Sequence, residues 1–316
     1  MDVGLIMKNI ARMHVHYFYS SIASDLPSMS DTSSIDLQKI KAQLRQGWDS
    51  VAEGWKRWWR PIEESAQVVS DRLVELAQIK QGQKVLDIGT GIGEPAVTVA
   101  RKVGPNGRVV GIDISPQMLA IAKERARDNG LDEIIEFREA DAESFSLPSS
   151  NFDAIVSRWG LMFLPNLPHA LASMREALVP GGRIAAAVWS VPQKVPFLSL
   201  AIGTAMREVA ASPPPPGTPG PFTLADTNML QEKFRQAGFR DVTIHVENMN
   251  FKAGSAEQFA AFHQAINAPI KIMIASQTPE RQSEIWTAIT EAARKHADQT
   301  GAVTLQNEVI YIAAQA

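Results

Sequence analysis

Short apolar runs alternate with amphipathic segments through the middle of the chain. The runs predict strands at Lys84–Ile88, Arg108–Ile112, Ile134–Arg138, Phe152–Val156 and Arg183–Trp189. The segments between them carry apolar residues at a helical period and predict helices at Pro95–Val103, Pro116–Asn129 and Leu167–Leu178. Near-continuous apolar strands that are separated by helices indicate a parallel sheet covered on both faces. We therefore expect a doubly wound α/β fold.

The flanking regions predict further elements. Residues 50–80 are expected to form a helix interrupted at Pro61, because proline removes a hydrogen bond from a helix interior. A proline-rich loop, SPPPPGTPGP at 212–221, leads into a C-terminal part. That part predicts helices at Asn228–Ala237, Ala256–Ser276 and Pro279–Gln299, and strands at Asp241–Val246 and Glu308–Ala314. Together these elements predict a seven-stranded sheet with an N-terminal helical lid and a helical insertion before the last strand.

The segment VLDIGTGIGEP, at 85–95, is the strongest candidate for a ligand site. Glycines at 89, 91 and 93 follow a predicted strand, so bare backbone allows a ligand to approach closely. A dinucleotide fingerprint needs its third glycine three residues after the second, but Glu94 stands there. Glu94 and Asp87 would both repel a pyrophosphate. Two acids around this turn favour a ligand with a positive end, such as S-adenosylmethionine.

Ordered motifs along the chain resemble those of class I S-adenosylmethionine-dependent methyltransferases. Besides the glycine segment they are VVGIDIS, EADAESF, and the pair FDAIVSRWGLMFL and LVPGGRIAAAVW. The resemblance implies a Rossmann-like methyltransferase sheet in which Asp113 holds both ribose hydroxyls and Asp141 with Ala142 binds the adenine edge. The predicted cofactor-binding residues are Asp87, Gly89, Thr90, Gly91, Gly93, Asp113, Ile114, Met118, Asp141, Ala142 and Ser157. S-adenosylhomocysteine would be the product.

Within that class, ISPQMLAIAKERA is similar to the ubiquinone/menaquinone-type small-molecule methyltransferases, with Met118 placed against the adenine or ribose. The tetrapeptide that serves base or amide methylation in other branches is replaced by residues 157–160, SRWG. We therefore expect methyl transfer to a small, apolar or aromatic metabolite, as in secondary metabolism. Two alternatives stay open: a methyltransferase acting on protein or RNA, and a non-catalytic module that binds S-adenosylmethionine.

Candidate acceptor-side residues lie outside the cofactor motifs. Trp48, Trp55 and Trp59 share one helical face and are either core anchors or a lid over the sulfonium. Arg158 and Trp159 follow the fourth strand, and Arg158 is expected to pair with the cofactor carboxylate, with Glu94 or with an anionic acceptor. His263 is the candidate general base, although a structural role is the competing interpretation.

Domain organisation follows from these assignments. We expect a flexible N-terminal arm at 1–44 and a methyltransferase domain at 45–316, with its core at 62–190. The segments 45–61, 191–230 and 251–300 are predicted to cap the substrate side.

Composition narrows the setting. The chain has no cysteine, which excludes disulfides and thiolate metal sites and fits a cytoplasmic protein, and we predict no bound metal. The net charge of −3 offers no basic field for nucleic acid. No apolar run approaches the ~20 residues of a membrane span. A monomer or homodimer is expected, with a small-molecule acceptor as its partner.

Overall fold

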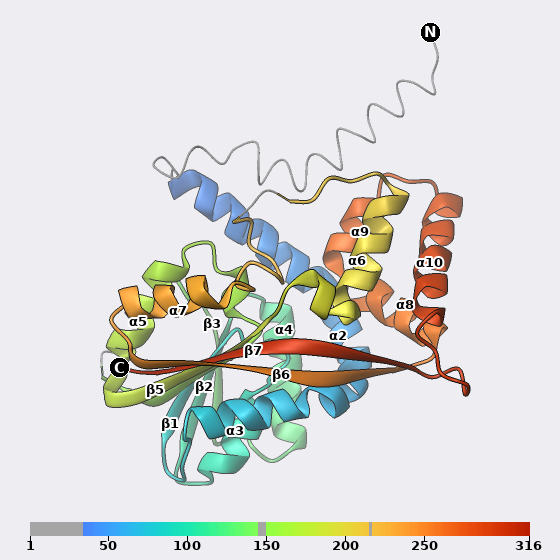
Figure 1. Ribbon diagram of the computed structural model, residues 1–316. Coiled ribbons are helices and arrows are strands. Elements are labelled where there is room, and N and C mark those ends of the chain that lie inside the picture. The colour runs from blue at the N-terminus through green and yellow to red at the C-terminus, as the bar shows by residue number, and fades with distance from the viewer. Residues whose placement is uncertain (1–33, 145–149, 215–216) are drawn as a thin grey trace. The chain divides into compact units, whose positions relative to one another are not determined.

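The computed structural model describes residues 34–144, 150–214 and 217–316 (Figure 1). Residues 1–33, which make up most of the predicted N-terminal arm, lie outside the described part. The chain divides into two compact units. One contains 62–195, 219–249 and 307–316 and is called the sheet unit; the other contains the described residues of 34–61, 196–218 and 250–306 and is called the helical unit.

The sheet unit is built on a seven-stranded sheet in the order β3-β2-β1-β4-β5-β7-β6. Its strands are β1 (Lys84–Ile88), β2 (Arg108–Asp113), β3 (Ile135–Glu139), β4 (Phe152–Arg158), β5 (Leu178–Trp189), β6 (Arg240–Gly254) and β7 (Val303–Gln315). β1 to β5 pair in parallel, whereas β7 runs antiparallel to β5. The predicted doubly wound α/β fold is confirmed. All five predicted core strands are present, each within a few residues of its expected bounds, although β5 begins at Leu178, five residues before the predicted Arg183.

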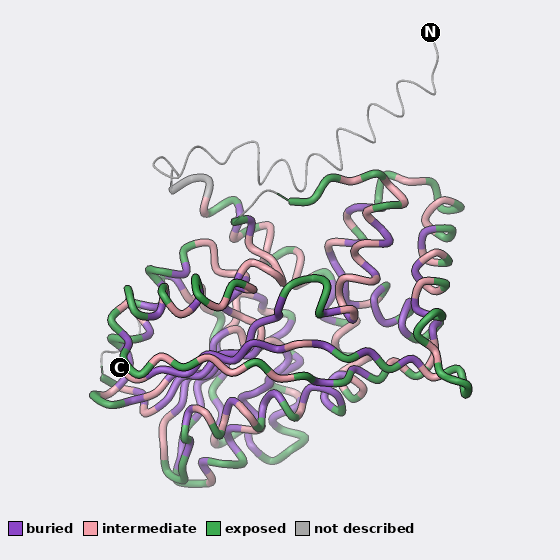
Figure 2. Tube along the Cα trace, viewed as in Figure 1, coloured by how far each residue is buried: buried purple, intermediate pink, exposed green. Residues whose placement is uncertain are grey.

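Helices cover both faces of this sheet. They are the last part of α2 (Ser34–Leu76), α3 (Ala96–Val103), α4 (Pro116–Asp128), α5 (Leu167–Ala177) and α7 (Thr227–Gln236), with short 3-10 turns at Leu161–Phe163 and Pro192–Lys194. Figure 1 shows α3 on one face and α5 with α7 on the other. The central strands are almost continuously buried, as Figure 2 shows, because both faces of each strand are covered by apolar side chains.

Helix α2 differs from its prediction in two ways. It begins at Ser34, before the predicted start at residue 50, so residues 34–44 of the predicted arm are helical. It also runs through Pro61 without interruption. Proline removes one backbone donor. The buried stripe formed by Ile62, Val69 and Leu73 keeps the following turns helical.

The helical unit contains three helices of the predicted insertion and one helix that the sequence did not predict. They are α8 (Ala256–Ile266), α9 (Ala268–Ile274), α10 (Pro279–Arg294) and the unpredicted α6 (Pro196–Glu208). The prediction of a single helix at 256–276 is wrong, because α8 ends at Asn267. The Asn267 side chain caps the start of α9 by accepting from the Ile270 N–H. The predicted cap segments 45–61 and 251–300 fall in this unit, whereas 191–230 is divided between the two units.

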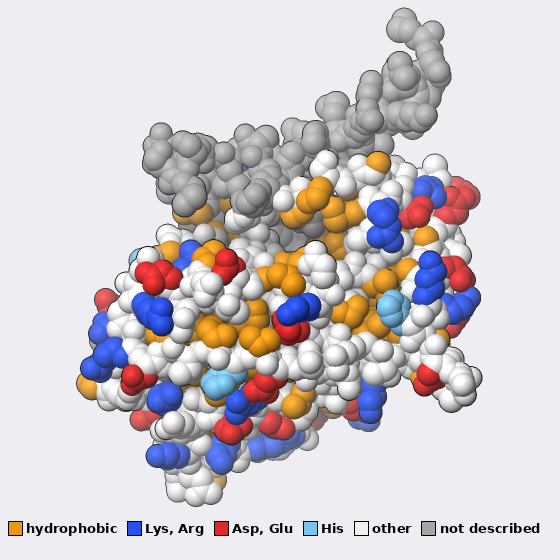
Figure 3. Space-filling model, in the orientation of Figure 1, with side chains coloured by type: hydrophobic (Ala, Val, Ile, Leu, Met, Phe, Trp, Pro, Cys, Tyr) orange, Lys and Arg blue, Asp and Glu red, His pale blue; other side chains and the backbone are white. Residues whose placement is uncertain are grey.

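Surface charge is mixed in sign. On the face drawn in Figure 3, lysine and arginine side chains alternate with aspartate and glutamate, and the described part of that face carries no continuous basic patch. In the part of the chain that the structure describes, every helix is either too short or too polar to cross a bilayer.

Candidate functional site

The glycine turn after β1 adopts a conformation that only glycine accepts readily. Gly89, Gly91 and Gly93 have φ values of 69°, 54° and 99°. The turn is held to the end of β2, where the Ile112 carbonyl accepts from the N–H groups of Gly89 (2.9 Å) and Thr90 (3.0 Å). A Cβ added to Gly91 would point into open space, with no atom within 4 Å. Bare backbone therefore faces an open region at the carboxyl ends of the strands, as a ligand site requires.

Asp87, the acid that precedes this turn, is fully buried and only half satisfied. Its Oδ2 accepts a hydrogen bond from the Ala96 N–H at 3.0 Å. Its Oδ1 has no hydrogen-bond partner among the described residues, and the hydroxyl of the buried Thr90 also has none. Burial raises the pKa of Asp87 to about 7, against the opposing effects of the nearby Thr90 hydroxyl and Arg158 guanidinium. A buried, unpaired carboxyl oxygen is costly unless a ligand supplies the missing donor.

Glu94, the second acid of the turn, already has hydrogen-bond and ion-pair partners within the protein. Its carboxylate accepts from the Thr98 hydroxyl at 2.8 Å and lies 3.8 Å from the Arg125 guanidinium. Arg125 also donates to the Ile92 carbonyl at 2.6 Å, which ties α4 to the turn. Asp87 and Glu94 were both expected to favour a cationic ligand, but of the two only Asp87 has an oxygen without a hydrogen-bond partner among the described residues.

Arg158 pairs with a residue that the sequence analysis did not consider. Its guanidinium makes a bidentate contact with Glu63 of α2, at 2.8 and 3.0 Å. It also donates to the Ser70 hydroxyl at 2.9 Å and to the Ala66 carbonyl at 3.4 Å. Of the three partners considered for Arg158, Glu94 is not the one that it pairs with, since the ion pair of Arg158 is with Glu63. The cofactor carboxylate and an anionic acceptor stay predictions. The Arg158 guanidinium is committed to one helix.

Asp113 ends β2 and helps to shape the glycine turn. Its Oδ2 accepts from the Gly91 N–H at 2.8 Å, and its Oδ1 accepts from the Ser115 N–H at 2.9 Å. The residue is only half-buried, and a carboxylate can accept more than one hydrogen bond at each oxygen. Ile114 follows and is also half-buried, whereas Met118 is buried in the first turn of α4.

Asp141 and Ala142 follow β3 and are both half-buried. The Asp141 carboxylate accepts from the Glu143 N–H at 2.9 Å and from the Ser144 hydroxyl at 2.8 Å. The turn is thus self-supporting and leaves the Ala142 backbone at the carboxyl edge of the sheet. The adenine-binding role of this pair stays a prediction.

The end of β4 is packed against the glycine turn. The buried Ser157 hydroxyl donates to the Ile88 carbonyl at 2.8 Å, which joins β4 to β1 and commits that side chain to the sheet. Trp159 follows with a φ of 62° and stacks on Trp189, with ring centroids 4.4 Å apart. Its indole N–H is buried and has no partner among the described residues.

The predicted lid tryptophans and His263 belong to the helical unit. Trp48 and Trp55 meet edge to face at 6.4 Å, and Trp59 lies on the same helix. His263 is fully buried between Phe197 and Phe259, at ring distances of 5.0 and 4.5 Å. Burial lowers its pKa to about 3, and its Nε2 has no partner among the described residues. The imidazole is therefore neutral near pH 7.

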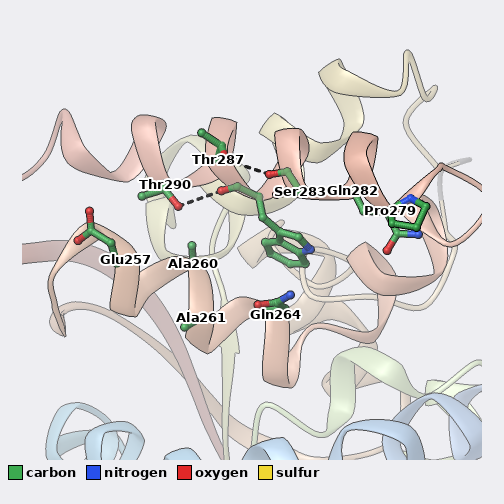
Figure 4. A pocket seen from close by; sticks show the side chains of 10 residues that line it. Glu257, Ala260, Ala261, Gln264, Pro279, Gln282, Ser283, Thr287 and Thr290 are labelled. Carbon is green, nitrogen blue, oxygen red and sulfur yellow. Dashed lines mark hydrogen bonds between the residues drawn. The ribbon is translucent and has the colours of Figure 1, made fainter.

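A groove of about 470 Å³ lies between α8 and α10 in the same unit (Figure 4). Trp286 and Ala260 line it, and none of the predicted cofactor residues does. Its only acidic or basic lining residue is Glu257, which pairs with Arg294. Across residues 34–144, 150–214 and 217–316, no cluster of histidine, aspartate and glutamate has an arrangement suited to a metal ion.

Glu63 is the site residue that the sequence analysis missed, and a signal for it exists. Apolar or small residues recur at a helical period after it, at Ala66, Ser70 and Leu73, and all of these are buried. An acid on such a stripe has to be paired when it is buried. Reading the stripe as the buried face of α2 would have identified Glu63 as half of a buried ion pair.

Comparison with known proteins gives consistent matches. Residues 79–212 match the family model described as a methyltransferase domain. The ubiquinone/menaquinone biosynthesis C-methyltransferase UbiE of Ectopseudomonas oleovorans is 40% identical over 135 residues, which cover 43% of this chain and 74% of that protein. The same-named protein of Pseudomonas entomophila is 39% identical over 144 residues, covering 46% of this chain. That alignment spans about half, 52%, of the relative's own length.

Solved structures share the fold. A methyltransferase structure from Bacillus halodurans superposes with a TM-score of 0.51 at 20% identity, covering 78% of this chain and 97% of that chain. A second bacterial structure, the YcgJ protein of a Bacillus, gives the same TM-score at 18% identity, with the same coverage of both chains. At these identities the likeness concerns the fold of the chain.

Proposed function

Because the chain belongs to the class I S-adenosylmethionine-dependent methyltransferases, we propose that it transfers the methyl group of that cofactor to a small, apolar or aromatic metabolite. Asp87 carries this proposal. It is a buried acid beside a glycine turn, with one oxygen unpaired, and it therefore suits a ligand that brings a positive charge and hydrogen-bond donors.

The residues around the turn fit the cofactor. Asp87 would accept a hydrogen bond from the amino group of the cofactor, and Asp113 would accept from its ribose hydroxyls. At the adenine edge, Asp141 would accept a hydrogen bond and the Ala142 backbone amide would donate one. The open space at Gly91 allows the backbone to approach the ligand. Gly89, Gly93, Thr90, Ile114, Met118 and Ser157 complete the proposed set, with Met118 packing against the adenosine and Ser157 acting through the strand end it supports.

When bound, the cofactor supplies an activated methyl group on a sulfonium, which needs no further activation as a leaving group. The chain has to hold the acceptor in line with that methyl at about 3 Å and exclude water. We assign the second task to Trp48, Trp55 and Trp59, and place Trp159 among the residues near the acceptor. Aromatic ring faces attract a sulfonium, as they attract other cations.

His263 is our candidate base. Its neutral imidazole has a free Nε2, which can accept a proton or a hydrogen bond from an acidic acceptor hydroxyl. Its low pKa means that it holds a proton only transiently, so it is suited to an acceptor that needs little help.

The acceptor class draws support from the relatives. Their printed names describe C-methylation in ubiquinone and menaquinone biosynthesis, which involves aromatic rings. A phenolic or quinone-like ring is therefore our preferred acceptor.

The test is to incubate the protein with S-adenosylmethionine bearing a deuterated methyl group and a metabolite extract, followed by mass spectrometry. A labelled small aromatic product supports the proposal. Label on protein or RNA supports a macromolecular acceptor instead, and cofactor binding without any labelled product supports a non-catalytic module.

A further inference from the structure

Five of the buried acidic and basic side chains act on one another electrostatically around the glycine turn, and they comprise three carboxyl groups and two guanidinium groups. They are Glu63, Asp87, Glu94, Arg125 and Arg158. Two pairs account for four of them: Arg158 with Glu63 at 2.8 Å, and Arg125 with Glu94 at 3.8 Å. The fifth, Asp87, keeps Oδ1 without a hydrogen-bond partner among the described residues. The site thus holds a carboxyl group that has no ion-pair partner of its own and that a cationic ligand would match.

Arg158 is close enough to compete for that carboxylate. β1 and β4 are paired in parallel with Asp87 opposite Val156, and side chains two residues apart on a strand share a face. Arg158 and Asp87 therefore lie on the same face of adjacent strands, and the two charges interact electrostatically. Besides Glu63, two carboxyl groups act electrostatically on Arg158, namely Glu94 and Asp87. Glu94 is already held by the Thr98 hydroxyl and by Arg125, so Asp87 is the acceptor left for a buried guanidinium that loses its partner. What prevents this is the set of acceptors on α2, above all the bidentate Glu63.

We propose that Glu63 is a positioning residue: by holding the Arg158 guanidinium on helix α2, it keeps Asp87 free for the amino group of the cofactor. The inference rests on the proposed placement of that amino group at Asp87. Glu63 itself does not touch the ligand in this account. It acts through Arg158, and its removal would let Arg158 occupy the position that the ligand's cation requires.

This arrangement also fixes the direction of a pH effect. Burial is the largest influence on the pKa of Asp87 and raises it to about 7. The charges that act on it are Arg158, which lowers the pKa, and Glu94, which raises it. Affinity for a cationic ligand should therefore rise with pH through about 7. If Arg158 moved onto Asp87, the pKa of Asp87 would fall, and this dependence would leave the neutral range.

The experiment measures S-adenosylhomocysteine binding by calorimetry between pH 5.5 and pH 8.5 for wild type, Glu63→Gln and Glu63→Gln/Arg158→Met. We expect Glu63→Gln to weaken binding about tenfold or more at pH 8 and to lose the pH step near 7. The double variant removes the competing cation and should recover the affinity, with a pH step that lies higher than in wild type because Arg158 no longer lowers the pKa of Asp87. Glu64→Gln is the matched control, since Glu64 is the exposed neighbour on the same helix.

Three outcomes would overturn the proposal. The first is an unchanged affinity in Glu63→Gln. The second is a double variant that binds as weakly as Glu63→Gln, which would mean that Arg158 contacts the ligand. The third is a loss of affinity in Glu64→Gln as large as that in Glu63→Gln. The variant Asp87→Asn distinguishes a failure of the Glu63 proposal from a failure of the proposed function. If Asp87→Asn binds S-adenosylhomocysteine as tightly as wild type, the placement of the amino group at Asp87 is refuted. If Asp87→Asn loses affinity and Glu63→Gln does not, only the role of Glu63 is refuted. Should Glu63→Gln fail to fold, Ser70→Ala loosens Arg158 more gently and should weaken binding about twofold to fivefold; unchanged affinity would again contradict the proposal.

Discussion

The carboxylate of Asp113 accepts the backbone N–H of Gly91 at 2.8 Å, so the acid at the end of β2 holds the glycine turn after β1. Asp113→Ala removes this contact and the proposed ribose acceptor together. We expect cofactor affinity to fall by about 1.5–3 kcal/mol, or roughly 10- to 150-fold. Calorimetry with S-adenosylhomocysteine measures the loss. Asp113→Asn, which keeps one carboxyl-like oxygen, should lose less, and unchanged affinity in the alanine variant would remove Asp113 from the site.

Asp87 should make stability fall as pH rises. Its pKa is about 7 in the folded protein against a usual value of 3.8, so the folded chain keeps a proton that the unfolded chain has already lost. The free energy of unfolding therefore decreases by on the order of 4 kcal/mol between about pH 4 and pH 7, and it levels off above pH 7. Chemical denaturation of the ligand-free protein at several pH values, compared with Asp87→Asn, isolates this contribution. Parallel pH profiles for the two proteins would contradict it.

Two glycines of α2 should respond in opposite ways to alanine. A Cβ at Gly54 would approach the Ala265 carbonyl oxygen to 2.2 Å, whereas a Cβ at Gly47 would meet no atom within 4 Å. Gly54→Ala should lower the free energy of unfolding by about 1–3 kcal/mol through overpacking. Gly47→Ala should raise it by up to about 1 kcal/mol, because alanine favours the helix. Thermal unfolding compares the two, and a destabilising Gly47→Ala would show that residue 47 has an unseen contact.

The tryptophan segment should become ordered on cofactor binding if it is a lid. Trp48 and Trp55 are only partly buried, although the indole N–H of Trp55 has no partner among the described residues. Closing over a bound sulfonium would exclude water before transfer. Hydrogen exchange of residues 45–60, with and without S-adenosylhomocysteine, should show protection that appears only with ligand. Strong and equal protection in both states would mean that these side chains are core, a result that the tight contact at Gly54 would then explain.

His263 should affect turnover without a pH step of its own. If it is the base, His263→Gln lowers kcat by about 10²- to 10⁴-fold while cofactor affinity is retained. Because the pKa of His263 is about 3, His263 does not titrate between pH 5 and pH 8. The pH profiles of kcat for wild type and His263→Gln should therefore have the same shape in that range. A variant with normal kcat and a lower unfolding temperature would assign His263 to the packing of the phenylalanine cluster instead.

The sheet and the glycine turn were predictable because their signals are local. Each core strand is a short apolar run, and the spacing of Gly89, Gly91 and Gly93 is visible within five residues. The bounds of α3 and α4 followed from the helical period of their apolar residues. Such features depend on neighbouring residues and hardly at all on tertiary contacts.

What the sequence did not reveal depends on packing between distant segments. The partner of Arg158 lies 95 residues away on α2, and no local pattern names it. The break at Asn267 was missed because the apolar period continues across it, and the continuity of α2 through Pro61 was missed because tertiary burial outweighs the lost hydrogen bond. The site residues themselves remain predictions, since they concern a ligand.

The strand ends at Gly89 and Gly160 set a limit on how this protein can be varied. A Cβ at Gly160 would come within 2.7 Å of the Ile88 carbonyl oxygen, and one at Gly89 would meet the Gly160 Cα at 3.1 Å. The two backbones therefore lie too close together for a side chain at either position. In a saturation library, therefore, both positions should tolerate glycine alone, and no second-site change should restore a larger residue at either one. Attempts to redesign acceptor choice have to leave this pair untouched and work on the residues around it.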